Sequence, residues 1–197
     1  MPTNLMIQFF TDTEECKKIQ MRLVLQAAPF LKGMKESALL SVPNSMLDEM
    51  RKLLEALSIK WFLLYGDDKK QMLLLYHQEQ LEELLADPVR IAFLKAYGYE
   101  KKCLEEKLEI LSLHMKNYYN KAGEFPHEIG VFLGYPQGDV EGFIANGGKN
   151  YLISSYWKVY ENESVTRERF AQFDQARERA VYQLLNGMSL QEIAAAA

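Results

Sequence analysis

Apolar residues recur every three or four positions along most of the chain, and this spacing places them on one face of a helix. The longest helical stripes lie in residues 16–30, 46–57, 104–118 and 170–184. A capping-box spacing in residues 11–14 precedes the first stripe, and Pro29 and Gly33 are expected to end that helix. The pattern predicts a chain in which helices predominate.

Shorter apolar runs lack helical spacing and predict strands. Residues 59–65 (IKWFLLY) and 72–77 (MLLLYH) flank a Gly-Asp-Asp-Lys turn, which is typical of an antiparallel hairpin. Both faces of these runs are apolar, so we expect helices on both sides of their sheet. Residues 35–42 predict another strand. Residues 151–160 (YLISSYWKVY) predict a further one from their aromatic and β-branched content.

These elements predict an α/β chain of the α+β type. We expect a small, partly antiparallel sheet of about three or four strands with several flanking helices, and with helix dominant. No repeat, low-complexity linker or shift in composition divides the sequence. We therefore expect residues 1–197 to form a single domain, the usual outcome for a chain of this length.

Composition indicates the class of protein and its location. Apolar residues make up 48% and aromatic residues 12% of the chain, which is enough for a packed core. The net charge of -4 disfavours binding to nucleic acid or to an anionic membrane surface. No apolar run approaches the ~20 residues of a membrane span. Because no signal-peptide pattern is present and Cys16 and Cys103 suggest reduced thiols, we expect a cytoplasmic protein.

Residues 125–160 (FPHEIGVFLGYPQGDVEGFIANGGKNYLISSYWKVY) contain a series of unusual motifs, namely FPHEIG, FLGYP, DVEGFI, GKNY and YWKVY. This block resembles the signature of a bacterial family filed as domain of unknown function 3793. Weaker matches at residues 28–35 (APFLKGMK) and 187–193 (GMSLQEI) extend the likeness over nearly the whole chain. The resemblance brings no activity, cofactor or catalytic residue with it. Two positions depart from the expected pattern, which has a Gly at Ser155 and a Cys near Ala176.

The pair His127 and Glu128 is the strongest candidate for catalytic chemistry in that block. Pro126 is expected to open a short helix, and a helix N-terminus favours a carboxylate and a neutral histidine. Such a pair offers general acid/base chemistry near neutral pH, although adjacent residues point about 100° apart on a helix. Capping and packing explain the same two residues without catalysis. The zinc-protease motif H-E-x-x-H is excluded, because Val131 replaces its second His.

A glycine pair precedes Lys149 and Asn150 and looks like a phosphate loop, but the Walker spacing and the hydroxyl residue are missing. We interpret Gly147 and Gly148 as the cap of a helix that Pro136 opens. Binding of an anion by Lys149 stays open, because adjacent glycines expose backbone N–H groups. The histidines and cysteines lack the close paired spacing of a metal site, so no metal is expected.

Aromatic residues alternate with a lysine at the end of the block. On a single strand, Trp157 points to one face, and Tyr156, Lys158 and Tyr160 point to the other. Two tyrosines around an amine suit a small anion or a flat ligand. The structural alternative has the same tyrosines half-buried beneath a helix, with their hydroxyls reaching water.

The favoured hypothesis is an accessory protein that binds a small ligand or a protein partner through residues 125–160. Its candidate contacts are His127, Glu128, Tyr135, Lys149, Tyr156 and Lys158. The alternative is an enzyme in which His127 acts as general acid/base, Glu128 orients it, and Lys149 or Lys158 holds an anionic substrate. The sequence identifies no cofactor. Both hypotheses require these side chains to share one concave surface.

Overall fold

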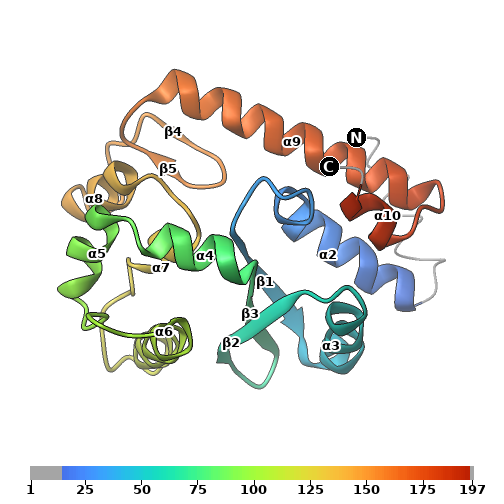
Figure 1. Ribbon diagram of the computed structural model, residues 1–197, viewed down its shortest axis with the longest axis horizontal. Coiled ribbons are helices and arrows are strands. Elements are labelled where there is room, and N and C mark those ends of the chain that lie inside the picture. The colour runs from blue at the N-terminus through green and yellow to red at the C-terminus, as the bar shows by residue number, and fades with distance from the viewer. Residues whose placement is uncertain (1–14, 196–197) are drawn as a thin grey trace.

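A three-stranded antiparallel sheet lies at the centre of the computed structural model, in which residues 15–195 are described (Figure 1). The strands are β1 (Ser37–Pro43), β2 (Lys60–Gly66) and β3 (Lys70–Tyr76), in the spatial order β1-β3-β2. Leu40 of β1 and Leu63 of β2 both lie opposite Leu73 of β3. The predicted hairpin and the predicted strand at residues 35–42 are confirmed.

Helices cover both faces of this sheet, as the apolar character of its strands predicts. One face packs against α2 (Glu15–Leu31), the 3-10 turn η1 (Asn44–Met46), α3 (Leu47–Ala56), α9 (Glu163–Leu185) and α10 (Leu190–Ala195). The other face packs against α4 (Gln78–Leu85), α5 (Pro88–Lys95), α6 (Leu104–Tyr119), α7 (Ile129–Phe132) and α8 (Gln137–Ala145). Figure 1 shows the two groups of helices on either side of the strands.

Alternation along β3 divides the core into two clusters. Leu73 and Leu75 point into the cluster around α2, whereas Met72 and Leu74 point into the cluster around α6. This is the period of two that a strand with two buried faces must show. The helix-dominated α+β fold class is therefore confirmed, and no helix within residues 15–195 is long and apolar enough to cross a bilayer.

The prediction of one strand over residues 151–160 is wrong, because the segment turns back on itself. It forms the two-stranded antiparallel hairpin of β4 (Ile153–Ser154) and β5 (Lys158–Val159). The Ser155 N–H donates to the Trp157 carbonyl at 3.1 Å and closes the turn. Trp157 and Val159 then pack on Phe170 and Phe173 of α9, so the aromatic content that suggested a strand forms a small third core.

The end of α2 also differs from expectation. Pro29 lies inside the helix, whose last residue is Leu31. Phe30 is fully buried, so packing holds the last turn although Pro29 lacks an N–H. Gly33, at a φ of +66°, ends the helix as predicted, and the Met34 N–H donates to the Pro29 carbonyl at 2.8 Å. The predicted capping box in residues 11–14 lies outside the described residues.

Candidate functional site

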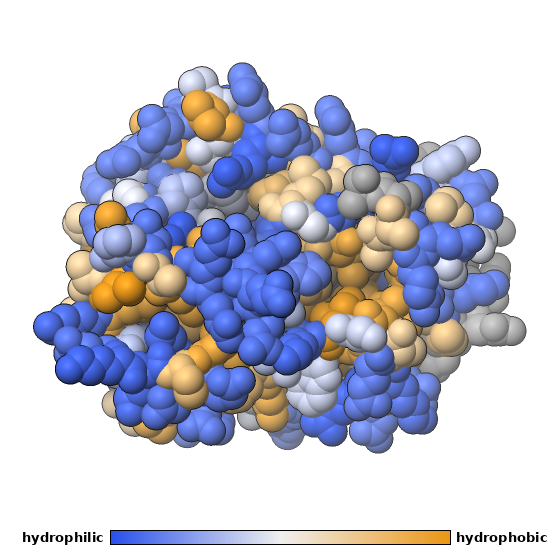
Figure 2. Space-filling model, viewed as in Figure 1, coloured by the Kyte–Doolittle hydropathy of each residue, from blue (hydrophilic) through white to orange (hydrophobic). Residues whose placement is uncertain are grey.

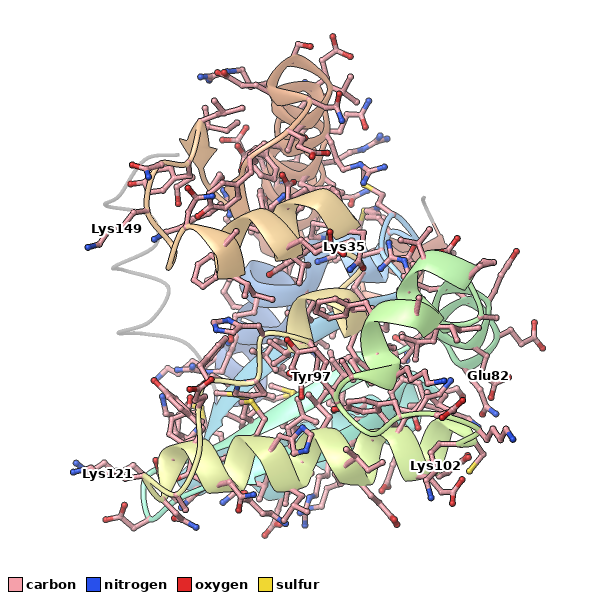
Figure 3. All side chains as sticks on the ribbon, turned by 90° about the vertical axis from the view of Figure 1, so that its left-hand side faces the viewer. Lys35, Glu82, Tyr97, Lys102, Lys121 and Lys149 are labelled. Atoms are coloured by element: carbon pink, nitrogen blue, oxygen red, sulfur yellow. The ribbon has the colours of Figure 1, made fainter. Side chains whose placement is uncertain are left out.

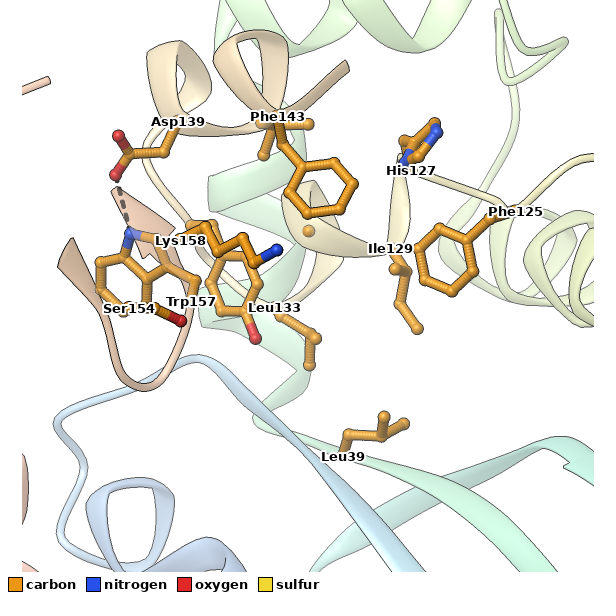
Figure 4. A pocket seen from close by; sticks show the side chains of 13 residues that line it. Leu39, Phe125, His127, Ile129, Leu133, Asp139, Phe143, Ser154, Trp157 and Lys158 are labelled. Carbon is orange, nitrogen blue, oxygen red and sulfur yellow. Dashed lines mark hydrogen bonds between the residues drawn. The ribbon is translucent and has the colours of Figure 1, made fainter. Parts of the chain in front are cut away.

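A cavity of about 340 Å³ lies where α7, α8 and the β4-β5 hairpin meet beside β1 (Figure 4). Its lining is mainly apolar and comprises Leu39, Phe125, Ile129, Gly130, Leu133, Tyr135, Val140, Phe143 and Trp157, together with the polar residues His127, Asp139, Ser154 and Lys158. Among the lining residues within 15–195, only Leu39, from β1, lies outside residues 125–158. Part of residues 125–160 thus lines one cavity, which we call the α8 pocket.

Close packing of α7 on α8 forms one wall of the pocket. A Cβ atom at Gly130 would lie 2.9 Å from Val140 Cγ2 and 3.2 Å from Tyr135 Cδ2. Such distances are shorter than ordinary contacts between carbon atoms, so any larger residue would push the wall outward. Gly134, at a φ of +70°, then ends α7 and turns the chain toward Pro136, the N-cap residue of α8.

Asp139 links α8 to the β4-β5 hairpin through hydrogen bonds. Its side chain is buried, Oδ2 accepts a hydrogen bond from Trp157 Nε1 at 2.7 Å, and Oδ1 accepts one from the Tyr160 N–H at 2.7 Å. The Glu161 N–H donates to the same Oδ1 at 3.1 Å. Three donors thus surround one buried carboxylate, which satisfies a charge that burial would otherwise penalise.

Stacked aromatic rings form the wall next to the hairpin. The rings of Tyr135 and Trp157 stack at a centroid distance of 4.9 Å, and Phe170 meets Trp157 edge-on at 4.6 Å. The Tyr135 hydroxyl donates to the Tyr156 carbonyl at 3.2 Å, and burial raises the pKa of Tyr135 to about 12. Tyr135 therefore contributes a neutral, fixed ring surface at physiological pH.

The two residues of the predicted catalytic pair face different surroundings. His127 lines the α8 pocket, and its ring centroid lies 5.3 Å from that of Phe125 and 5.4 Å from that of Phe143. Glu128 is fully buried instead, with Oε1 2.6 Å from His114 Nδ1 and accepting from the Tyr99 hydroxyl at 3.2 Å. Within residues 15–195, no hydrogen bond joins His127 to Glu128.

The buried Glu128 carboxylate also affects its tyrosine partner. Burial, followed by the negative charge of Glu128 and its hydrogen bond, raises the pKa of Tyr99 far above the ordinary value for a tyrosine. The phenol thus stays protonated and remains a donor. Glu128, His114 and Tyr99 form a polar cluster inside the core, which we call the Glu128 cluster.

Lys158 supplies the cation of the α8 pocket. Its Nζ donates to the Gly148 carbonyl at 2.7 Å and lies 5.5 Å from the ring centroid of Phe143 and 4.9 Å from that of Tyr151. Figure 4 shows the amine directed toward the space between Phe143 and Leu133. Because an ammonium has three donors and one is used here, Lys158 keeps hydrogen-bonding capacity for a ligand.

The remaining candidates, Lys149 and Tyr156, lie outside this lining. Lys149 extends from the surface on the turn after α8 (Figure 3), where the N–H groups of Gly147, Gly148 and Lys149 donate to preceding carbonyls and cap the helix. The Tyr156 hydroxyl donates to Asp174 Oδ1 at 3.1 Å, and burial is the main reason that its pKa rises to about 12. The structure thus groups His127, Tyr135 and Lys158, and separates the other three candidates from them.

Several residues that shape the pocket were not candidates from the sequence. In the sequence, Asp139 is recognisable only as an acidic residue in the first turn of a helix. A favourable interaction with the helix dipole explains that position equally well. Phe125 and Phe143 carry no chemistry that distinguishes a pocket wall from a core. Leu39 belongs to a strand more than eighty positions earlier, so only the tertiary fold brings it to the site.

Comparison with known proteins gives a family and no activity. A family model described as "Protein of unknown function (DUF3793)" matches residues 23–194. No curated protein and no solved structure matches the chain. The matched range includes every residue of the α8 pocket and of the Glu128 cluster.

Proposed function

This chain belongs to the family described as "Protein of unknown function (DUF3793)", and because that description assigns no activity, we propose one from the site itself. The proposed function is that of an accessory protein that binds a small molecule in the α8 pocket. The ligand has a flat, mainly apolar body and a negatively charged group. One observation carries this proposal: in the part of the chain that the structure describes, a largely apolar cavity of about 340 Å³ contains a single ammonium group in its lining.

The size and lining of the pocket support a small ligand. Small-molecule sites are typically concavities of about 300–1,000 Å³, lined by apolar and aromatic side chains with a few polar groups. The α8 pocket falls within this range, and the stacked pair of Tyr135 and Trp157 offers an aromatic surface. An apolar body of one or two rings matches both the volume and the wall.

The polar groups support a negative charge on that ligand. The Asp139 carboxylate and the Tyr135 hydroxyl are already bound within the protein, so neither needs a partner from a ligand. Among the described residues of the lining, His127, Ser154 and Lys158 keep donors available to a ligand, and of these Lys158 carries the positive charge. A carboxylate or sulfonate beside Lys158 would form a charge-assisted hydrogen bond in mainly apolar surroundings.

A calorimetric titration with 4-nitrobenzoate tests the charge preference. We expect the affinity to fall by roughly ten- to a hundredfold in Lys158→Met, because a hydrogen bond to a charged group contributes roughly 1.5–3 kcal/mol. The neutral probe 4-nitrobenzyl alcohol should bind the two proteins alike. Lys149→Met is the matched control, since it removes an exposed lysine from the same segment without touching the pocket. Equal losses in the two variants would refute the charge assignment.

Filling the pocket tests its location. Ser154 lines the cavity with an exposed side chain, so Ser154→Trp places a large ring at its entrance with little risk to the fold. Ser155 is also exposed but does not line the cavity, and Ser155→Trp therefore serves as the control. We expect loss of 4-nitrobenzoate binding only in Ser154→Trp. Unchanged affinity in that variant would place the ligand elsewhere.

Three further hypotheses from the sequence remain predictions: an enzymatic activity, binding of a protein partner, and a cytoplasmic location. An enzyme using His127 and Glu128 gains no support from the geometry, because Glu128 contacts His114 and Tyr99 rather than His127. Binding of a protein partner likewise stays a prediction. We infer a cytoplasmic location in a bacterium from the family resemblance and from Cys16 and Cys103, both of which are free thiols.

A further inference from the structure

A row of aromatic rings extends from the wall of the α8 pocket. Phe125 lines the pocket, and the Tyr118 ring meets it edge-on at a centroid distance of 5.2 Å. Tyr119 lies 5.2 Å from Tyr118, and Tyr65 of β2 stacks on Tyr119 at 4.0 Å. We call these four residues the aromatic strip. Figure 4 shows Phe125 and Trp157 at opposite ends of the pocket, so the strip begins at the end away from the β4-β5 hairpin.

The middle of the strip is open to solvent. Tyr118, Tyr119 and Phe125 keep 38%, 37% and 39% of their surface exposed. Hydrophilic side chains instead cover the region of α4, at the centre of the face that Figure 2 shows. Exposed apolar side chains that stand alone are normal, but a contiguous row of them indicates a binding surface.

The tyrosines of the strip also offer hydrogen-bond donors. Among residues 15–195, the hydroxyls of Tyr65, Tyr118 and Tyr119 form no hydrogen bond. A phenol can donate to a carbonyl group of a ligand while its ring packs on an apolar part of the same ligand. The strip therefore suits a ligand that combines apolar rings with carbonyl acceptors.

A proline-rich peptide has this combination. Its polyproline II backbone forms no internal hydrogen bonds, so the carbonyls are free to accept, and proline has no N–H that needs an acceptor. Such peptides bind to aromatic-lined surfaces. The helix advances about 3.1 Å per residue, so three prolines span roughly 9 Å. This length is comparable with the two successive ring spacings of 5.2 Å from Phe125 to Tyr119.

The angles between the rings favour proline over a stacked sugar chain. The plane of the Tyr118 ring is inclined by 88° to that of Phe125 and by 68° to that of Tyr119. Rings inclined so strongly do not form one flat platform on which successive sugar rings could stack. Small proline rings need no such platform.

Charge complementarity sets the direction of the peptide. Lys158 supplies the positive charge of the α8 pocket, and the carboxyl terminus of a peptide supplies a negative one. A C-terminal aromatic residue also has the flat apolar body of the proposed ligand. We propose that the α8 pocket binds the C-terminal aromatic residue of a peptide, and that the prolines before it lie along the aromatic strip. The proposal rests on the proposed function of the pocket and adds the class of its ligand.

A calorimetric titration with acetyl-Pro-Pro-Pro-Phe, which has a free carboxylate, tests the proposal. We expect this peptide to bind the full chain about tenfold tighter than N-acetylphenylalanine, because the prolines bury further apolar surface on the strip. Acetyl-Gly-Gly-Gly-Phe lacks the rings and loses more conformational freedom, so it should bind no tighter than N-acetylphenylalanine. Amidation of the carboxylate should weaken binding of the proline peptide by roughly ten- to a hundredfold.

Two variants of α6 test the location of the prolines. Tyr118→Ala removes a ring from the middle of the strip. Leu113→Ala is the matched control, since it removes another exposed apolar side chain from the same helix, about 140° away around its axis. We expect the tenfold gain from the prolines to be lost in Tyr118→Ala and kept in Leu113→Ala. Both variants should bind 4-nitrobenzoate alike.

The outcomes distinguish the peptide assignment from the pocket itself. If neither 4-nitrobenzoate nor N-acetylphenylalanine binds, both proposals are overturned. If they bind but the prolines add nothing, or the glycines add as much, only the peptide assignment is overturned. Equal losses in Tyr118→Ala and Leu113→Ala would overturn it too, as would tighter binding of trigalacturonate, an acidic sugar trimer, than of the proline peptide.

Discussion

Single residues in this molecule show how strongly burial decides what a polar side chain does. Glu128 and His127 are neighbours in sequence, yet one is fully buried in the core and the other lines the α8 pocket. One oxygen of Glu128, Oε1, contacts His114 and Tyr99, while Oε2 is buried and has no hydrogen-bond partner among residues 15–195. A carboxylate in such surroundings lowers the stability of the folded chain unless its charge is compensated.

A double-mutant cycle tests the role of the Glu128 cluster. We expect His114→Leu to lower the free energy of unfolding by about 2 kcal/mol. This loss is smaller than that for breaking a fully buried ion pair, because the His114 side chain is 32% exposed. The double variant His114→Leu/Glu128→Leu should lose less than the sum of the single losses, because no charge is then left buried. Urea denaturation at pH 7 measures all four stabilities. Additive losses would mean that the two groups do not interact.

Lys35 predicts a pH dependence with a definite sign. Burial lowers its pKa in the folded chain from the ordinary 10.5 to about 8, so the unfolded chain binds more protons at this site between those values. Stability contributed by this group is therefore lowest below pH 8 and increases as the pH rises toward 10.5. We compare the free energy of unfolding of Lys35→Met with that of wild type. The difference in favour of the variant should be greatest below pH 8 and should shrink by about 2–3 kcal/mol as the pH rises toward 10.5. Urea denaturation of both proteins at pH 7 and pH 10 measures the difference, and a pH-independent difference would contradict the assignment.

At the scale of elements, one carboxylate decides where the β4-β5 hairpin lies. Asp139 at the start of α8 accepts from the Trp157 side chain and from two backbone N–H groups that follow β5. The two strands contribute only two residues each, so their own ladder cannot hold the hairpin in place. The wall of the α8 pocket therefore depends on Asp139.

Replacing Asp139 by Asn should release the hairpin. An amide removes the charge and turns one acceptor into a donor, which then faces donors. We expect a loss of about 2–3 kcal/mol in the free energy of unfolding, together with loss of 4-nitrobenzoate binding. Asp174→Asn is the control, because this carboxylate binds Tyr156 on the same hairpin but is half exposed. Hydrogen exchange should show faster exchange at Tyr160 in Asp139→Asn alone; equal exchange in both variants would contradict this role.

Local patterns predict the elements of this fold better than they predict its site. The Gly-Asp-Asp-Lys turn and the stripe of α6 are both encoded by neighbouring residues, and each appears as expected. The YLISSYWKVY segment is different, because Asp139 and the α9 phenylalanines decide that it turns rather than extends. The directions of Glu128 and Tyr156 likewise depend on His114 and Asp174, to which no sequence pattern points.

At the scale of the whole molecule, one sheet joins the two larger cores. Successive residues of β3 enter opposite clusters, so neither cluster is complete without the same strand. The third cluster, around Trp157, connects to the others through α9, which packs beside α2. From this connectivity we propose that residues 15–195 behave as one domain, in line with the expectation from the sequence.

The two tryptophans provide probes of that expectation, because Trp61 packs against the first cluster and Trp157 belongs to the third. We expect urea transitions followed by Trp157 fluorescence in Trp61→Phe to coincide with those followed by far-UV circular dichroism. Trp61 fluorescence in Trp157→Phe should coincide with circular dichroism in the same way. Coincident probes indicate cooperative unfolding of a single unit. A Trp157 transition at lower urea than the circular dichroism would instead indicate a separate unit.

The central claim is that the α8 pocket binds a flat anion against Trp157. Since the chain has only two tryptophans, Trp61→Phe leaves Trp157 as the sole indole, and the nitro group of 4-nitrobenzoate quenches indole fluorescence on contact. We predict saturable quenching in Trp61→Phe that Lys158→Met weakens and Lys149→Met does not. We predict no saturable quenching of Trp61 in Trp157→Phe. Saturable quenching of Trp61, or none of Trp157, would contradict the account.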